Sequence, residues 1–222
     1  MPQMDQIIQN LTVYALPLLF AITLHEAAHA YVARYFGDNT AYSQGRMSLN
    51  PVKHIDPFGT IVLPLIFFLL SSPFLIGYAR PVPVDFGRLR KPKRDMAWVA
   101  LAGPMANLVM ALGWLILAIF LVAGGFDERF FFNQVAVAGI KVNLLLFAFN
   151  LFPLPPLDGG RILTSILPHS LAYKFARIEP YGFFILLALL FLQVLHFWIG
   201  PVQYLGQLVI STIVQPLKLL LF

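Results

Sequence analysis

The stretch LTVYALPLLFAITLHEAAHAYVARYF, residues 11–36, decides the fold class of this chain. It is long and apolar enough to cross a bilayer as one helix, because about 20 consecutive apolar residues span the hydrocarbon core. The same stretch nevertheless contains His25, Glu26 and His29. Ionisable side chains are costly inside a membrane and usually serve a function there. We therefore expect a membrane-spanning helix that carries a polar functional site.

The composition of the whole chain also indicates a membrane protein. Hydrophobic residues occupy 59% of the 222 positions and charged residues only 11%, and the mean hydropathy is +0.78. Soluble domains are far less apolar. We predict an all-α polytopic membrane protein that forms a single membrane-embedded domain over residues 1–222. Its candidate transmembrane runs are residues 8–36, 58–78, 97–123, 132–152, 181–199 and 202–222.

Cysteine content and charge narrow the possible functions. The chain has no cysteine, which excludes disulfides, thiolate metal sites and a thiol nucleophile. The net charge is +5, and in a membrane protein such an excess of basic residues is typical of cytoplasmic loops, so we expect no nucleic-acid partner. No Lys or Arg precedes the first apolar run, which argues against a removable signal peptide.

The pattern HEAAH, residues 25–29, predicts a metal site. Positions i and i+4 share one face of a helix, so His25 and His29 can offer two imidazole nitrogens to one ion. Glu26 lies one residue further along and can reach a water bound there, which is the arrangement of zinc hydrolases. The alternative is a set of polar residues satisfied at a helix interface.

A catalytic zinc needs a third protein ligand, and the candidate is Asp158 in NLFPLPPLDGG, residues 150–160. Three prolines in this stretch should end the preceding helix and extend the chain from about Phe152. Gly159 and Gly160 then permit a tight turn and a close backbone approach. Since non-helical backbone at membrane depth must face protein or a watery cavity, the stretch is expected to line the site. The alternative is a helix stop followed by a surface loop.

Together these motifs resemble the site-2 protease family of intramembrane zinc metalloproteases. AGPMAN, residues 102–107, is similar to that family's third motif, and GRMSLNPVKHIDPFGT and ARPVPV resemble its short bacterial and archaeal branch without a PDZ domain. The resemblance implies a metalloprotease core over about residues 8–165, accessory C-terminal helices over about 181–222, and one zinc ion per chain. It also implies the site residues: His25, His29 and Asp158 as zinc ligands, Glu26 as the general base, and Asn107 and Asn150 as polar groups of the active site.

By the same resemblance the substrates would be transmembrane segments of membrane proteins, cut for regulated intramembrane proteolysis or for clearance of signal-peptide remnants. A separate regulatory chain is possible in such a system. Two rival functions stay open: a non-catalytic membrane scaffold that keeps the fold, and a metal-binding or transport protein. His54 and Asp56 form a second polar cluster, for which a turn histidine with a capping aspartate is favoured over a metal site or a contact with an active-site lid.

The metal imposes a topology. If all six runs crossed the membrane, HEAAH and Asp158 would lie near opposite surfaces. The conflict disappears if the run 58–78 is re-entrant, because the loops 37–57 and 79–96 then share the cytoplasmic side. We therefore predict five crossings, an external N-terminus, a cytoplasmic C-terminus and an active site towards the cytoplasmic side of the plasma membrane. A short β-like hairpin should follow the HEAAH helix.

Overall fold

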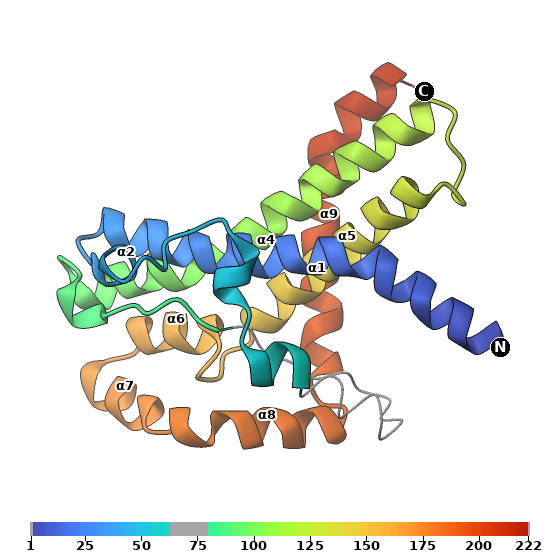
Figure 1. Ribbon diagram of the computed structural model, residues 1–222. Helices are drawn as coiled ribbons and strands as arrows, with labels where there is room; N and C mark the ends of the chain where they lie inside the picture. Colours follow the sequence, from blue (N-terminus) through green and yellow to red (C-terminus); the bar gives the residue numbers. More distant parts are fainter. Residues whose placement is uncertain (1, 63–79, 222) are drawn as a thin grey trace.

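The computed structural model describes residues 2–62 and 80–221, and every regular element in these two ranges is helical (Figure 1). The long helices are α1 (Pro2–Tyr35), α4 (Pro92–Ala123), α5 (Phe131–Asn150) and α9 (His196–Leu221). Shorter helices are α2 (Thr40–Ser43), η1 (Pro51–His54), η2 (Pro57–Val62), η3 (Phe86–Arg88), α6 (Asp158–Ile166), α7 (His169–Ala176), η4 (Glu179–Tyr181) and α8 (Gly182–Phe191).

Four of the described helices are long and apolar enough to cross a membrane: α1 over Ile8–Tyr35, α4, α5 and α9. Their lengths of 20 to 32 residues fit the roughly 30 Å thickness of a hydrocarbon core. The prediction of an all-helical, multi-pass membrane protein is confirmed at this level.

Small residues allow the spanning helices to pack closely, as is usual between helices in membranes. One cluster joins Ala111 of α4, Leu144 of α5 and Ile210 of α9. Elsewhere a Cβ atom built on Gly139 of α5 would lie only 2.4 Å from the ring of Trp114 in α4. The absence of a side chain at that position therefore sets how closely α4 and α5 approach.

The loops that follow α1 and precede α4 lie together, as the metal argument requires. The Arg90 backbone N–H donates to the carbonyl of Phe36 at 2.9 Å, and the Arg80 N–H donates to the carbonyl of His54 at 2.9 Å. The buried Asp38 carboxylate accepts the Asp85 N–H at 2.8 Å. The segment that follows α1 and the segment that precedes α4 therefore lie at the same end of the long helices. The predicted re-entrant run, 58–78, lies mostly outside the described residues.

The predicted β-like hairpin after the HEAAH helix is wrong for the described part of this segment, which contains no strand. Residues 40–43 form α2 and residues 51–54 form η1. The physical reason is local: the Asp38 side chain accepts the Thr40 N–H at 2.9 Å and starts a helical turn.

The predicted crossing at 181–199 is also wrong. α8 has only 10 residues, about 15 Å of helix, and the chain turns at Gln193, whose φ is +57°, before α9 begins. The indole Nε1 of Trp198 donates to the carbonyl of Ala148 at 3.0 Å, so α9 starts beside the end of α5.

Because α9 starts beside the end of α5, its C-terminal end lies near the N-terminal part of α1 and the loop between α4 and α5. Val13 of α1, Glu128 of the α4–α5 loop and Lys218 of α9 line one cavity, and Figure 1 shows the end of α9 beside the end of α4. Among the described residues four helices are candidates for a crossing, in place of the predicted five, while the sides on which the two termini lie stay a prediction.

Candidate metal centre and active site

His25 and His29 lie on the same face of α1 and meet at their outer nitrogens. Their ring centroids are 4.7 Å apart and their Nε2 atoms are 3.0 Å apart. Each residue is only 8% exposed. The i, i+4 geometry expected from the sequence is therefore present, with both Nε2 atoms directed to one point.

The inner nitrogens of both rings are bound by neighbouring α4. The carbonyl oxygen of Val99 lies 2.7 Å from Nδ1 of His29; it can only accept, so this Nδ1 carries the proton. The Oδ1 atom of Asn107 lies 2.7 Å from Nδ1 of His25. A neutral imidazole that donates through Nδ1 presents a bare Nε2, which is the form that binds a metal.

The amide of Asn107 is itself oriented. Its Nδ2 donates to the carbonyl of Ala21 at 3.3 Å and to Oδ1 of Asn143 at 3.1 Å, so its oxygen must face His25. Asn143 in turn donates to the carbonyl of Gly139 at 2.9 Å. Both amides are fully buried. Asn107 was predicted to be a polar group of the active site. In the structure it is buried behind His25 and positions that imidazole.

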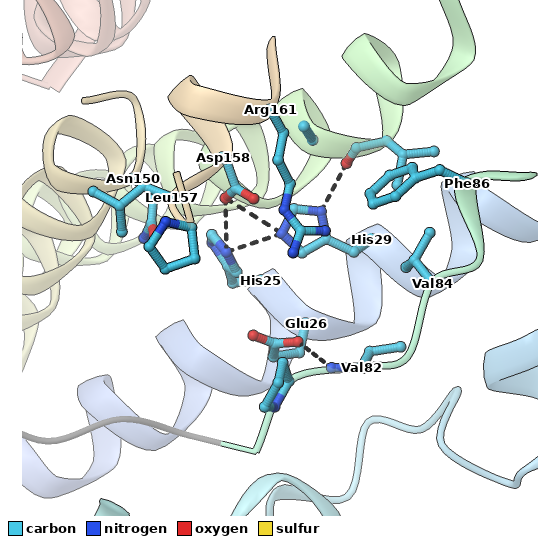
Figure 2. Close-up of a pocket in the computed structure, with 14 residues that line it drawn as sticks. His25, Glu26, His29, Val82, Val84, Phe86, Asn150, Leu157, Asp158 and Arg161 are labelled. Carbon is cyan, nitrogen blue, oxygen red and sulfur yellow. Dashed lines mark hydrogen bonds and ion pairs between the residues drawn. The ribbon is translucent and has the colours of Figure 1, made fainter. Parts of the chain in front are cut away.

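Asp158 reaches the two histidines from the first turn of α6 (Figure 2). Its Oδ2 atom lies 3.2 Å from Nε2 of His25 and 3.4 Å from Nε2 of His29, and this buried oxygen has no hydrogen-bond partner. Burial disfavours the charged form of Asp158, but the two imidazoles beside it, His29 above all, outweigh burial and lower the pKa of this carboxyl well below its usual range. Asp158 is therefore a carboxylate at neutral pH.

The stretch before Asp158 brings the carboxylate to the histidines by close backbone packing. α5 ends at Asn150, and residues 151–157 form turns and bends, so the predicted extended chain is replaced by a compact one. Gly159 and Gly160 begin α6 and do not form the predicted turn. Their close backbone approach is confirmed, because a Cβ on Gly159 would lie 2.2 Å from the carbonyl oxygen of Leu151.

The three converging groups fit a cation. One ligand atom from each of His25, His29 and Asp158 lies within 4.8 Å of the other two, and no other group of three such side chains gathers among residues 2–62 and 80–221. Two bare imidazole nitrogens and a carboxylate oxygen are all acceptors, so their convergence is stable only around positive charge. Two nitrogens and one oxygen form the ligand set of many catalytic zinc sites.

The three converging side chains line a cavity of about 160 Å³, and Glu26 lines the same cavity. Its Oε2 atom accepts the backbone N–H of Val82 at 2.6 Å (Figure 2), which holds the carboxylate beside the metal ligands. Asn150 also lines this cavity, while its Nδ2 donates to the carbonyl of Leu146 at 3.0 Å. Of the two predicted amides, Asn150 is thus the one that borders the cavity.

Comparison with known proteins agrees with this geometry. The chain is 39% identical over 208 residues to "Putative zinc metalloprotease YwhC" of Bacillus subtilis, which covers 90% of this chain and 91% of the relative. Residues 127–193 match the sequence model of Peptidase family M50. The chain belongs to peptidase family M50.

Two further M50 relatives are more distant. "Putative zinc metalloprotease Rip2" of Mycolicibacterium smegmatis is 31% identical over 189 residues, which cover 84% of this chain and 69% of the relative. "Putative zinc metalloprotease MJ0611" of Methanocaldococcus jannaschii is 27% identical over 139 residues, or 63% and 62% of the two chains. No solved structure matches the chain. The predicted family and the predicted enzyme class, a zinc metalloprotease, are confirmed.

The structure adds site residues that the sequence reasoning for this M50 chain missed. Asn143 completes the chain of amides behind His25. The sequence could have indicated it, because an amide side chain within an apolar run usually has a function. Val82 holds Glu26 through its backbone, a role that no side-chain pattern reveals. The second polar cluster is structural in part: Oδ1 of Asp56 accepts the N–H groups of Phe58 and Gly59, as the capping interpretation predicted.

Proposed function

We propose that this chain is an intramembrane zinc metalloprotease that hydrolyses peptide bonds within or near transmembrane segments of membrane proteins. The observation that carries the proposal is the cluster of His25, His29 and Asp158 beside Glu26, in a cavity at the end of membrane-spanning helices. An acid-base group next to a three-ligand metal site is what peptide hydrolysis needs.

Bound zinc would supply Lewis acidity towards water and the substrate carbonyl, held by the three ligands at one per chain. Glu26 takes the proton from the attacking water and passes it to the leaving amide nitrogen as the C–N bond breaks. Its contact with the Val82 N–H engages only Oε2, so Oε1 is available for proton transfer. Asn107 keeps His25 in the required tautomer.

A transmembrane substrate must unwind locally before this chemistry, because the carbonyls of an intact helix are bonded to its own N–H groups. The cavity beside Glu26 offers both an apolar and a polar lining: Val84, Phe86 and Leu157 lie near Asn150 and Arg161. Such a mixture suits a partly unwound apolar segment. Asn150, at the border of the cavity, is the amide we propose for contact with the substrate backbone.

We place the active site towards the cytoplasmic side of a plasma membrane. The segment between residues 80 and 95, which leads from the site into α4, carries six cations and two acids, and short loops rich in Lys and Arg stay on the cytoplasmic side. The fragments released there would serve regulated intramembrane proteolysis, or the same reaction would clear signal-peptide remnants. A partner chain could regulate access.

The experiment that tests the proposal measures zinc per chain and cleavage of a model transmembrane substrate in the same purified samples. We expect wild type to hold one zinc and to cleave, and His25→Ala and Asp158→Ala to lose both properties. Glu26→Gln should keep zinc and lose cleavage, because it keeps the shape of the side chain and removes the base. Glu128→Gln, on the remote α4–α5 loop, is the matched control and should behave as wild type.

Retention of zinc by Asp158→Ala at the wild-type level would remove Asp158 from the ligand set. Cleavage by Glu26→Gln at the wild-type rate would remove Glu26 from its role as base. Zinc binding without cleavage by wild type, across several transmembrane substrates, would favour the scaffold alternative.

A further inference from the structure

A second cavity lies at the opposite end of the helices from the metal centre. Its volume is about 680 Å³, and residues of α1, α4, α5, the α4–α5 loop and α9 line it. Neither the metal ligands nor Glu26 border it. The proposed proteolysis therefore leaves this cavity without a role.

Lys141 is the unusual residue of this cavity. It lies ten residues after the start of α5 at Phe131, about 15 Å along a membrane-spanning helix. A lysine at such a depth is costly unless it pairs with an anion or reaches an aqueous space. Within residues 2–62 and 80–221, Lys141 forms no ion pair or hydrogen bond. Its charge therefore lacks a protein partner in the described part of the chain.

Lys218 adds a second cation from the last turn of α9. Among the residues that the structure describes, Glu128 is the single acidic residue that lines the cavity, and no ion pair joins it to either lysine. The two amides in the lining already have partners: Asn133 donates to the carbonyl of Asp127 at 3.0 Å, and Gln134 donates to that of Arg129 at 3.2 Å. The lining that the structure describes therefore has a net positive charge and two cations without an ion pair or hydrogen bond to another described residue.

Apart from the hydroxyl group of Tyr14, the remaining wall is apolar. Leu115, Ile119 and Val122 of α4 face the cavity together with Val13 of α1 and Val137 of α5. A soluble anion would gain nothing from these side chains, whereas an acyl chain would bury its surface against them.

We propose that this cavity binds an anionic phospholipid, with the phosphate between Lys141 and Lys218 and an acyl chain along the apolar wall. The long stem of Lys141 can carry its ammonium group from the depth of its Cα towards the headgroup level. Two ammonium groups can hold a phosphate through charge-assisted hydrogen bonds. The bound lipid would neutralise Lys141 and fill the space between α1, α4 and α5.

The test uses the full chain in detergent and counts retained lipid by native mass spectrometry. The probes are phosphatidylglycerol, phosphatidylcholine of the same acyl length, and inorganic phosphate. We expect phosphatidylglycerol to be retained at least tenfold more strongly than phosphatidylcholine, and millimolar inorganic phosphate not to displace it. Each lysine should contribute about fivefold, so Lys141→Gln with Lys218→Gln should weaken retention about 25-fold.

Two controls keep the result interpretable. Lys141→Arg with Lys218→Arg keeps the charge and should keep the lipid, and Lys174→Gln removes one exposed cation from α7, on the side of the metal centre, and should have no effect. Equal retention by wild type and the double Gln variant would overturn the proposal. So would equal binding of phosphatidylcholine, or displacement of the lipid by inorganic phosphate. None of these measurements requires catalysis, so the result is independent of the proposed proteolysis.

Discussion

Gly103 provides a sensitive test of the metal site, because a single methyl group added there would occupy the space between the imidazoles. A Cβ built on Gly103 would lie 2.4 Å from Nε2 of His29 and 2.6 Å from Nε2 of His25. Cβ contacts shorter than 3.0 Å essentially never occur, so Gly103→Ala must displace at least one ring. Both rings are fixed from behind by Asn107 and Val99, which leaves them little freedom to move.

The magnitude follows from the cost of adding one methyl group to a closely packed site, about 1–3 kcal/mol. If this strain falls on the ligand geometry, the affinity of Gly103→Ala for zinc should fall by about 5- to 150-fold. The matched control is Gly113→Ala on the same helix, where an added Cβ meets no atom within 4 Å. That variant gains helix propensity and should bind zinc as wild type does.

The assay is competition for zinc between each purified variant and a coloured chelator, with circular dichroism to verify helix content. The reasoning would be refuted if Gly103→Ala and Gly113→Ala bound zinc equally well while both kept wild-type helix content. Loss of zinc by both variants would also refute it, because α4 would then be sensitive to any added methyl group.

Three further results are expected. Asn107→Leu removes the oxygen that accepts the hydrogen bond from Nδ1 of His25, with little change in side-chain volume. In the same competition assay this variant should bind zinc about 10- to 100-fold more weakly. An unchanged affinity would show that Asn107 does not position His25. Gly139→Ala should lower the free energy of unfolding by about 1–3 kcal/mol, because its Cβ would lie 2.4 Å from the Trp114 ring; denaturation in detergent measures this, and zinc affinity serves as the internal control. The chain has no cysteine, so a single cysteine introduced at Gln44 or Glu128 can be labelled selectively in intact cells. We expect Gln44→Cys to react only with a reagent that enters the cytoplasm and Glu128→Cys to react with a reagent that stays outside. Labelling of both variants from the same side would contradict the arrangement.

The extent to which the sequence predicted the site differs between its parts. His25 and His29 were predictable because four residues make about one helical turn, whatever surrounds the helix. Asp158 was predicted from its motif NLFPLPPLDGG and from the need for a third ligand, and the meeting of the loops at Arg90 and Phe36 agrees with the topology that a shared metal imposes. The acceptor of each Nδ1 atom could not be predicted, since Val99 acts through its backbone and Asn107 through the rotamer that Asn143 imposes.

The two errors in the fold have a common cause. The run 181–199 is as apolar as a true span, but composition does not show that α8 ends after ten residues and that the chain then turns back to α5. The segment after α1 has the composition of a hairpin, but the Asp38 side chain favours a helical turn. In both places a contact or a single backbone angle outweighs the average preference of the residues.

The sequence by itself therefore determined the apolar, membrane-type composition, the helical class, the candidate metal-binding pair on α1 and the enzyme family, because these depend on composition, helical periodicity and local motifs. Only the tertiary structure decided which amide supports His25, why Gly103 must lack a side chain, how Glu26 is held by Val82, and where the chain reverses before α9. These features depend on distances between atoms far apart in the sequence, and such distances are set by how whole helices pack against one another.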